Sequence, residues 1–259
     1  NQVPPMKEND LFFEVECSIL IMKIHTYRRV ASKRVLKMHA FKDRAEILRF
    51  IELVGQSDQE EVNKHIQNCI FDISSTLVGE ELFEFVLAIS SFRVTRFQFN
   101  ARVLPEEITM LLNYLPHLEE LSLAYHMHFS KEEAKKVCEL AHLKKIDFSD
   151  TLIPEDIACV FLQNDKLIEV NFSGTLANMN MILPSILALP LLCNLNLMLS
   201  GLIDSNLIVQ LLSKKSLKKV TLDTISMPSE KEIKALRKNK TITDLFLNGS
   251  NAKNNEKLL

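Results

Sequence analysis

The chain has 259 residues, a formal net charge of −2, 47% hydrophobic residues and 25% charged residues. This composition is typical of a soluble globular protein and excludes wholesale disorder, and a nearly neutral chain gives no general argument for nucleic-acid binding. Glycine occurs only 5 times and tryptophan is absent. So few glycines argue against a Rossmann fold, a P-loop enzyme or a sheet of tight hairpins, because each needs glycine at turns or phosphate loops.

Residues 1–67 show no internal repeat, and we expect them to form an N-terminal cap of mixed helix and strand. Residues 43–54 have an amphipathic helical pattern, and residues 15–24 are a short apolar run that suits a strand. The basic run 23–42 could contact an anionic membrane or an acidic partner, but a solvated face of the cap is the interpretation we favour. The chain begins Asn1-Gln2, so a preceding targeting or F-box segment stays open.

A six-residue pattern, apolar-x-x-apolar-x-apolar, recurs at intervals of 24 or 25 residues after the cap. Its copies are Val94-Phe97-Phe99, Leu118-Leu121-Leu123, Leu143-Ile146-Phe148, Leu167-Val170-Phe172, Leu192-Leu195-Leu197, Leu217-Val220-Leu222 and Ile242-Leu245-Leu247. An earlier copy near Asn68 aligns residues 71–78 with 146–153. Near-equal spacing predicts a repeat protein with about eight short strands, the last over 242–247.

A helix is predicted after each strand. Proline followed by acidic residues occurs at Pro105 and Pro154, and both residue types favour the first turn of a helix. Each unit is therefore expected to be a strand, a tight corner and a short helix. The apolar stretch 179–202 keeps the same spacing and contains Pro184 and Pro190, so we assign it to the repeats rather than to a membrane span.

The segment Leu118-x-x-Leu121-x-Leu123 and its copies resemble the leucine-rich repeat, L-x-x-L-x-L-x-x-N. The resemblance implies an α/β fold: a leucine-rich-repeat solenoid over 68–250, with a parallel sheet on the concave face and helices on the convex face. The cap over 1–67 would precede it, and a flexible tail over 251–259 would follow it.

The sequence departs from the family at the ninth repeat position, which usually holds Asn or Cys. Thr and Ser at several of these positions are expected to bond the corner backbone more weakly. The residues that cannot do so are Arg102, His126 and Ile225, which puts regular curvature in doubt at their corners.

The low-glycine composition, rich in Asn and Lys, also resembles the leucine-rich-repeat effectors that intracellular bacteria such as Legionella deliver into host cells. This resemblance implies a partner that is a host protein or a second effector, and a location in the host cytosol. Without it, the expectation is a cytoplasmic protein, because five cysteines without a CxxC pair suggest reduced thiols.

Enzymatic chemistry is not indicated. The chain lacks GxSxG, HExxH, GxxxxGK[ST] and GxGxxG, so we expect no catalytic residue, no cofactor and no metal. His126 and His128 form a pair without a third ligand close by. Cys17 and His25 could act as nucleophile and base, but a thiol inside an apolar run is inert.

The strand residues between the buried apolar positions should face the concave surface, because side chains alternate across a strand. The predicted partner-binding residues are Arg96, Gln98, Asn100, Glu119, Glu120, Tyr125, Lys144, Lys145, Asp147, Ile168, Glu169, Asn171, Asn194, Asn196, Met198, Lys218, Lys219, Asp223, Asp244 and Phe246. Their charges alternate in patches, which suits protein recognition better than a continuous phosphate-binding stripe would.

The sequence therefore predicts a non-catalytic module that binds another protein, such as an enzyme whose active site it covers, and binds no nucleic acid. Reversing the charges of Glu119, Glu120, Lys144 and Lys145 is expected to abolish binding. Two alternatives stay open. One is a ubiquitin-ligase substrate adaptor, and the other is a Ran-type GTPase activator, for which Arg96 and Arg102 are the candidate arginines.

Overall fold

The structure is a computed structural model that describes residues 79–99, 103–223 and 229–248, together with strand residues 37–40 and 69–72 and the single positions 49 and 52. The strand predicted over 15–24, the basic run up to residue 36 and the tail over 251–259 lie outside the described residues. Of the helix predicted over 43–54, only Arg49 and Glu52 are described, and both are helical.

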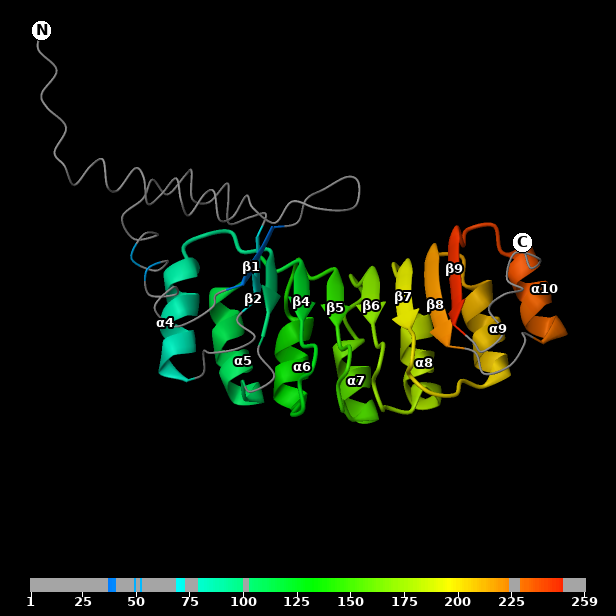
Figure 1. Ribbon diagram of the computed structural model, residues 1–259, viewed down its shortest axis with the longest axis horizontal. Helices are drawn as coiled ribbons and strands as arrows, with labels where there is room; N and C mark the ends of the chain where they lie inside the picture. Colours follow the sequence, from blue (N-terminus) through cyan, green and yellow to red (C-terminus); the bar gives the residue numbers. More distant parts are fainter. Residues whose placement is uncertain are drawn as a thin grey trace, which may run out of the picture.

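The described strands form one parallel sheet of nine strands, arranged in the order in which they occur along the chain (Figure 1). They are β1 (Lys37–Ala40), β2 (Cys69–Asp72), β3 (Arg96–Gln98), β4 (Glu120–Ser122), β5 (Lys145–Asp147), β6 (Glu169–Asn171), β7 (Asn194–Leu197), β8 (Lys219–Asp223) and β9 (Asp244–Asn248). The strands predicted from residue 94 onwards are confirmed.

The register of the sheet follows the sequence repeat. Leu121 lies beside Ile146, and Ile146 lies beside Val170, so equivalent residues of successive repeats are direct neighbours. Strand β1 pairs with β2 in the same parallel manner. The sheet thus includes a strand from the segment that the sequence assigned to a cap.

Short helices connect the strands and lie together in a second layer beside the sheet (Figure 1). They are α4 (Glu80–Ile89), α5 (Pro105–Leu111) with a 3-10 turn η1 (Leu112–Tyr114), α6 (Lys131–Cys138), α7 (Glu155–Phe161), α8 (Met179–Ala188), α9 (Ser205–Ser213) and α10 (Glu230–Lys238). The sequence explains how they begin: Pro105 starts α5, and Pro154 caps α7. Ser130 caps α6 in a reciprocal box with Glu133.

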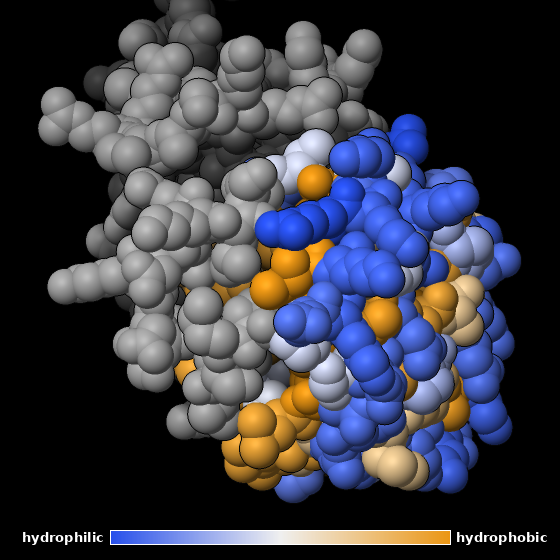
Figure 2. Space-filling model, turned by 90° about the vertical axis from the view of Figure 1, so that its right-hand side faces the viewer, coloured by the Kyte–Doolittle hydropathy of each residue, from blue (hydrophilic) through white to orange (hydrophobic). Residues whose placement is uncertain are grey.

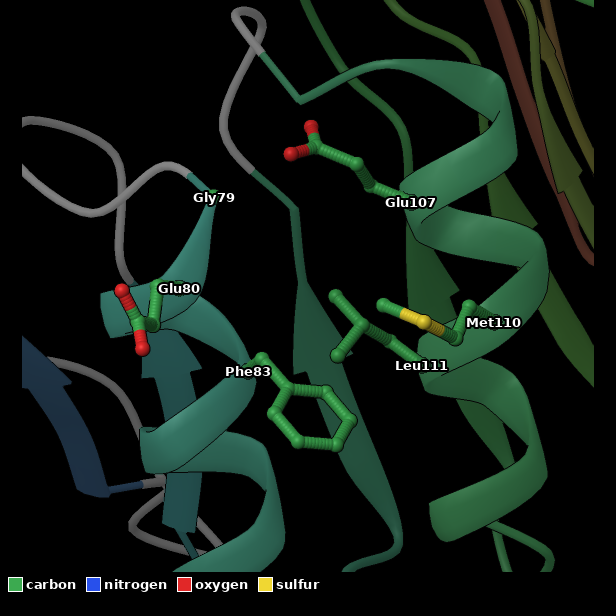
Figure 3. A pocket seen from close by; sticks show the side chains of 6 residues that line it. All are labelled: Gly79, Glu80, Phe83, Glu107, Met110 and Leu111. Carbon is green, nitrogen blue, oxygen red and sulfur yellow. The ribbon is translucent and has the colours of Figure 1, made fainter.

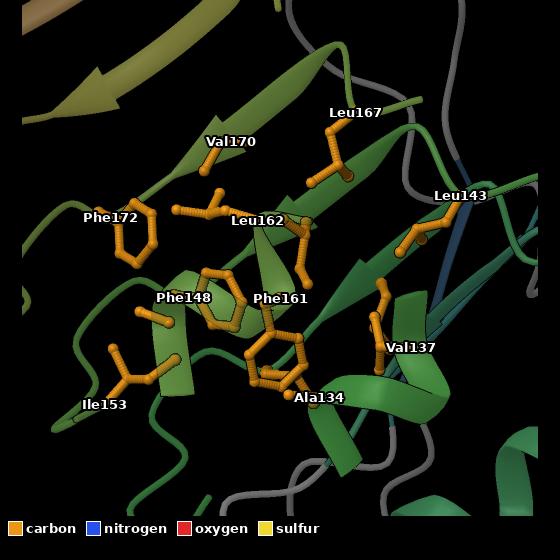
Figure 4. Packing of buried hydrophobic residues seen from close by; sticks show 14 of the residues in the cluster. Ala134, Val137, Leu143, Phe148, Ile153, Phe161, Leu162, Leu167, Val170 and Phe172 are labelled. Atoms are coloured by element: carbon orange, nitrogen blue, oxygen red, sulfur yellow. The ribbon is translucent and has the colours of Figure 1, made fainter. Parts of the chain in front are cut away.

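The core lies between the sheet and the helices. Phe148 of one repeat stacks on Phe172 of the next with ring centroids 5.0 Å apart, and Phe161 of α7 meets the edge of Phe148 at 5.0 Å (Figure 4). Phe129 packs against Phe148 and Phe161 at 6.2 Å. Each repeat buries its apolar residues against the next, so the core is continuous along the solenoid.

The corners after the strands are held by buried hydroxyl groups, as the Thr and Ser residues predicted. Thr151 Oγ1 donates to the Phe148 carbonyl at 2.7 Å, and Ser200 Oγ donates to the Leu197 carbonyl at 2.6 Å. At the equivalent corner, His126 is fully buried and its ring meets Phe129 at a centroid distance of 5.4 Å. Strands β4 and β5 stay in register around it. The corners at Arg102 and Ile225 lie outside the described residues.

The stretch 179–202 forms α8, the following connection and β7, as the repeat spacing predicted. Among the described residues, the helices are all too short or too polar to cross a membrane.

Candidate functional site

The strands expose one face of the sheet. In β3, β4, β5 and β6 the middle residue is buried, whereas the residue on either side of it is half-buried. The half-buried residues are the third and fifth positions of each repeat, which the sequence assigned to the concave face. The parallel register lines them up in rows across the sheet.

The third-position row forms a series of ion pairs that we call the charge ladder: Arg96, Glu120, Lys145 and Glu169. Glu120 accepts from Arg96 Nε and from Lys145 Nζ, each at 3.0 Å, and Lys145 Nζ also lies 3.5 Å from Glu169. Asn194 extends the row by donating to Glu169 at 3.0 Å. Partial burial opposes the charge of Lys145, but hydrogen bonds to Glu120 and Glu169 outweigh it and raise the pKa of its ammonium group.

A second cross-strand pair lies beside the charge ladder. Lys144 Nζ donates to Glu119 at 2.8 Å, and this hydrogen bond lowers the pKa of the Glu119 carboxyl. In the fifth-position row, Asn171 Nδ2 donates to Asp147 Oδ1 at 2.8 Å. The charges of this half of the face therefore largely satisfy one another.

The C-terminal part of the face differs. Lys218, Lys219 and Asp244 are exposed, and within the described ranges no carboxylate or ammonium group forms an ion pair with them. Phe246, in the neighbouring strand, is 58% exposed. Figure 2 faces this end of the molecule and shows a mainly hydrophilic described surface with hydrophobic side chains between the polar ones.

The other predicted residues have varied positions. Gln98, Ile168, Asn196 and Met198 are half-buried, so only part of each is available to a partner. Tyr125 lies in the turn after β4 rather than in the strand, and is 59% exposed. Asp223 is placed in β8 by its backbone. Asn100 lies outside the described residues.

Sequence reasoning missed the ion pairing. The information was present, since Glu119 and Lys144 lie 25 positions apart in the sequence, as do Glu120 and Lys145. A spacing of one repeat places opposite charges side by side in a parallel, in-register sheet. The residues proposed as a charged binding patch therefore also neutralise one another.

The candidate catalytic and metal-binding residues that the structure describes, His126, His128 and Arg96, do not form a common site. His126 is buried and His128 is exposed, so the pair does not share an environment. Arg96, a candidate for a GTPase activator, is ion-paired with Glu120. In the described part of the chain, no three His, Cys, Asp or Glu side chains are grouped as metal ligands. Arg102, Cys17 and His25 lie outside the described residues.

A cavity of about 320 Å³ lies between α4 and α5. Phe83 and Leu111 point into the space between the two helices, with Met110 beside them (Figure 3). The carboxylate of Glu107 is engaged with the Leu104 backbone N–H at 2.9 Å. The cavity offers a small apolar surface and no catalytic arrangement of side chains.

Sheet topology and repeat spacing together define the class: the chain is an α/β solenoid whose repeats resemble the leucine-rich repeat. No protein-family model matches the chain, and no curated protein matches it. A crystal structure of a TLR13–ssRNA13 complex matches with a TM-score of 0.44 and 16% identity, over 74% of this chain and 27% of that one. The chain thus spans about a quarter of the length of that protein, and the likeness does not bear on its ligand.

Proposed function

We propose that the chain is a non-catalytic interaction module that binds a protein partner through the open face of its sheet, chiefly at β7–β9. The observation that carries the proposal is the contrast along this face. Its first part is neutralised by the charge ladder, whereas Lys218, Lys219 and Phe246 are exposed together at its C-terminal part.

Exposed lysines favour an acidic protein surface. Among the described residues no ion pair holds Lys218 or Lys219, so pairing them with partner carboxylates costs less than it would at Lys144 or Lys145, whose ion pairs would have to break. The exposed ring of Phe246, which lies next to Thr221 in the neighbouring strand, supplies the apolar contact that interface centres favour.

The rigid sheet also favours binding. The backbone of β7–β9 is held in a parallel, in-register sheet, so little backbone conformational entropy is lost when a partner docks.

The test compares charge variants in affinity capture followed by mass spectrometry, from host-cell and bacterial lysates. K218E/K219E is expected to lose the partner. The matched control is E119K/K144E, which exchanges the two charges of a pair that lies 2.8 Å apart and so preserves the pair. We expect this variant to keep the partner, because the exchanged charges still pair with each other.

The outcomes separate the two parts of the face. A partner lost only from E119K/K144E would move the site to β4–β5. A partner retained by both variants would contradict binding through these charges. Circular dichroism of each variant checks that the fold is intact.

We also propose that the protein is cytoplasmic and that it is a bacterial effector. In the host cytosol it would act on a host protein or on a second effector. This extension rests on composition alone. It predicts that the captured partner comes from the host lysate or is itself an effector, and a housekeeping partner found only in the bacterial lysate would contradict it.

A further inference from the structure

Exposed hydrophobic side chains are concentrated on one edge of the solenoid. Of the 12 large hydrophobic residues that are exposed within the described residues, seven lie in the connections that leave the strands for the next helix. We call these seven the strand-end rim: Leu104, Tyr125, Met127, Leu152, Leu176, Leu199 and Leu202. Leu191 is the exposed leucine of the opposite edge, where the chain returns from α8 to β7.

The strand-end rim recurs with the repeat. The same connection leaves each strand from β3 to β7, and each contributes at least one of the seven residues. Successive turns are hydrogen-bonded to each other: the Tyr125 N–H donates to the Ser149 carbonyl at 3.0 Å, and the Gly174 N–H donates to the Met198 carbonyl at 2.8 Å. The apolar side chains therefore project from a rigid row.

Two rim residues are kept in a backbone conformation that does not suit them. Tyr125 and Leu199 have φ of 63° and 58°, and the equivalent residues of the two intervening repeats are Asp150, with φ of 55°, and Gly174, with φ of 69°. Glycine adopts this conformation freely, whereas a large side chain is strained in it. Tyr125 and Leu199 are each 59% exposed, so burial in the core does not compensate for the strain. The conformation recurs at this position in four successive repeats, so it belongs to the corner itself, and it places Tyr125 and Leu199 among the exposed residues of the rim.

The rim also has a charge pattern. Four of the five connections, 123–130, 148–154, 172–178 and 198–204, contain no lysine or arginine, whereas the connection 99–104 contains Arg102. Exposed carboxylates lie along it instead, in the turns and at the starts of the helices: Glu106, Glu132, Asp150, Asp156 and Asp204. Lys131 pairs with Asp156 at 2.8 Å. An apolar row flanked by acidic groups is complementary to an apolar stripe flanked by basic groups.

We propose that the strand-end rim binds an amphipathic helix of a partner protein whose apolar stripe is flanked by Lys and Arg. Neighbouring strands lie about 4.8 Å apart and an α-helix advances about 5.4 Å per turn, so a helix lying along the rim sets about one apolar side chain against each repeat. This surface is separate from the sheet face at β7–β9, and the two proposals stand independently.

The probe is a synthetic 18-residue amphipathic peptide with leucines on one stripe and lysines on both flanks, titrated against the full chain by fluorescence anisotropy. We expect it to bind, and we expect a peptide with glutamates in place of the lysines to bind at least about tenfold more weakly. Absence of binding by the lysine peptide, or equal affinity of the two peptides, would overturn the proposal.

Variants locate the contact. L176S/L202S should weaken the lysine peptide at least about tenfold, because two exposed rim leucines lose their apolar contact. The matched control L191S/M181S removes two exposed apolar residues outside the rim and should leave the affinity unchanged. Equal losses in the two variants would contradict a rim site. K218E/K219E should also bind the peptide normally, which separates this result from that of the sheet face.

Leu199→Gly separates binding from folding. Glycine relieves the strained turn, so the melting temperature should not fall, whereas the affinity for the peptide should fall.

Two other results would replace the helix with a different occupant of the strand-end rim. They are a dimer in light scattering that L176S/L202S abolishes, and flotation with neutral phosphatidylcholine vesicles that the same variant abolishes.

Discussion

The central repeats (94–178) and the C-terminal repeats (192–248) share one sequence pattern but use it differently. Beneath the central strands lies a stack of phenylalanines, and above them lies the charge ladder. At the C-terminal end, Leu245 and Leu247 are half-buried, and Lys218, just before β8, and Lys219 in β8 are exposed. The comparison teaches that one repeat pattern can have two outcomes: in the central repeats the polar positions pair with each other across the sheet, and in the C-terminal repeats they stay exposed without such pairs among the described residues.

The largest expected difference is in core packing. Phe148→Ala should cost about 3–5 kcal/mol, because the ring is fully buried and contacts rings of two neighbouring elements. Leu245→Ala should cost only about 1–2 kcal/mol, because a half-exposed leucine removes less surface from water on folding. Urea unfolding followed by circular dichroism measures both, and equal losses would contradict the comparison.

The sequence was a good guide wherever apolar spacing decided the structure. The 24- or 25-residue interval placed β3–β9, and Thr151 and Ser200 at the ninth position predicted the bonded corners. It was a poorer guide to the site. That Glu120 sits between two cations becomes visible only when residues one repeat apart are compared across the parallel register, a comparison that the sequence reasoning did not make. The strained conformation of Tyr125 and Leu199 is likewise invisible in residues that usually avoid it.

A buried carboxyl is the exception within the well-satisfied central repeats. Glu133 of α6 is fully buried, and this burial raises the pKa of its carboxyl group to about 8. Its Oε2 accepts weakly from the Ser130 backbone N–H at 3.4 Å, and Glu106 adds like-charge repulsion. The folded protein therefore holds this proton in a pH range in which the unfolded chain releases it.

The sign of the pH effect follows from that difference. The unfolded carboxyl ionises near its ordinary pKa of 4.5, so stability should fall as pH rises from about 4.5 to about 8 and then level off. Glu133→Gln keeps a neutral acceptor for the cap and should remove this slope. At pH 8 it should stabilise the protein by a few kcal/mol, as measured by urea unfolding at several pH values, with Glu132→Gln as the exposed control. A wild-type slope unchanged in Glu133→Gln would assign the pH dependence to other groups.

The smallest effect tests the charge ladder itself. Glu120→Ala leaves Arg96 and Lys145 without their shared carboxylate, and should cost about 0.5–1 kcal/mol because these pairs are partly exposed. Lys219→Ala, at the same position of β8, breaks no ion pair among the described residues and should change stability by less than about 0.5 kcal/mol.

Added salt tests the origin of this difference in stability between Glu120→Ala and Lys219→Ala, because salt screens ion pairs and leaves packing intact. At 1 M NaCl the screening length is about 3 Å, so the cost of Glu120→Ala should shrink towards that of Lys219→Ala. A cost that persists in high salt would mean that Glu120 contributes through the packing of its methylene groups against neighbouring strands. If Lys219→Ala instead caused a large, salt-sensitive loss of stability, Lys219 would form a stabilising ion pair in the folded protein. The proposal that Lys218 and Lys219 bind a partner would then lose its basis.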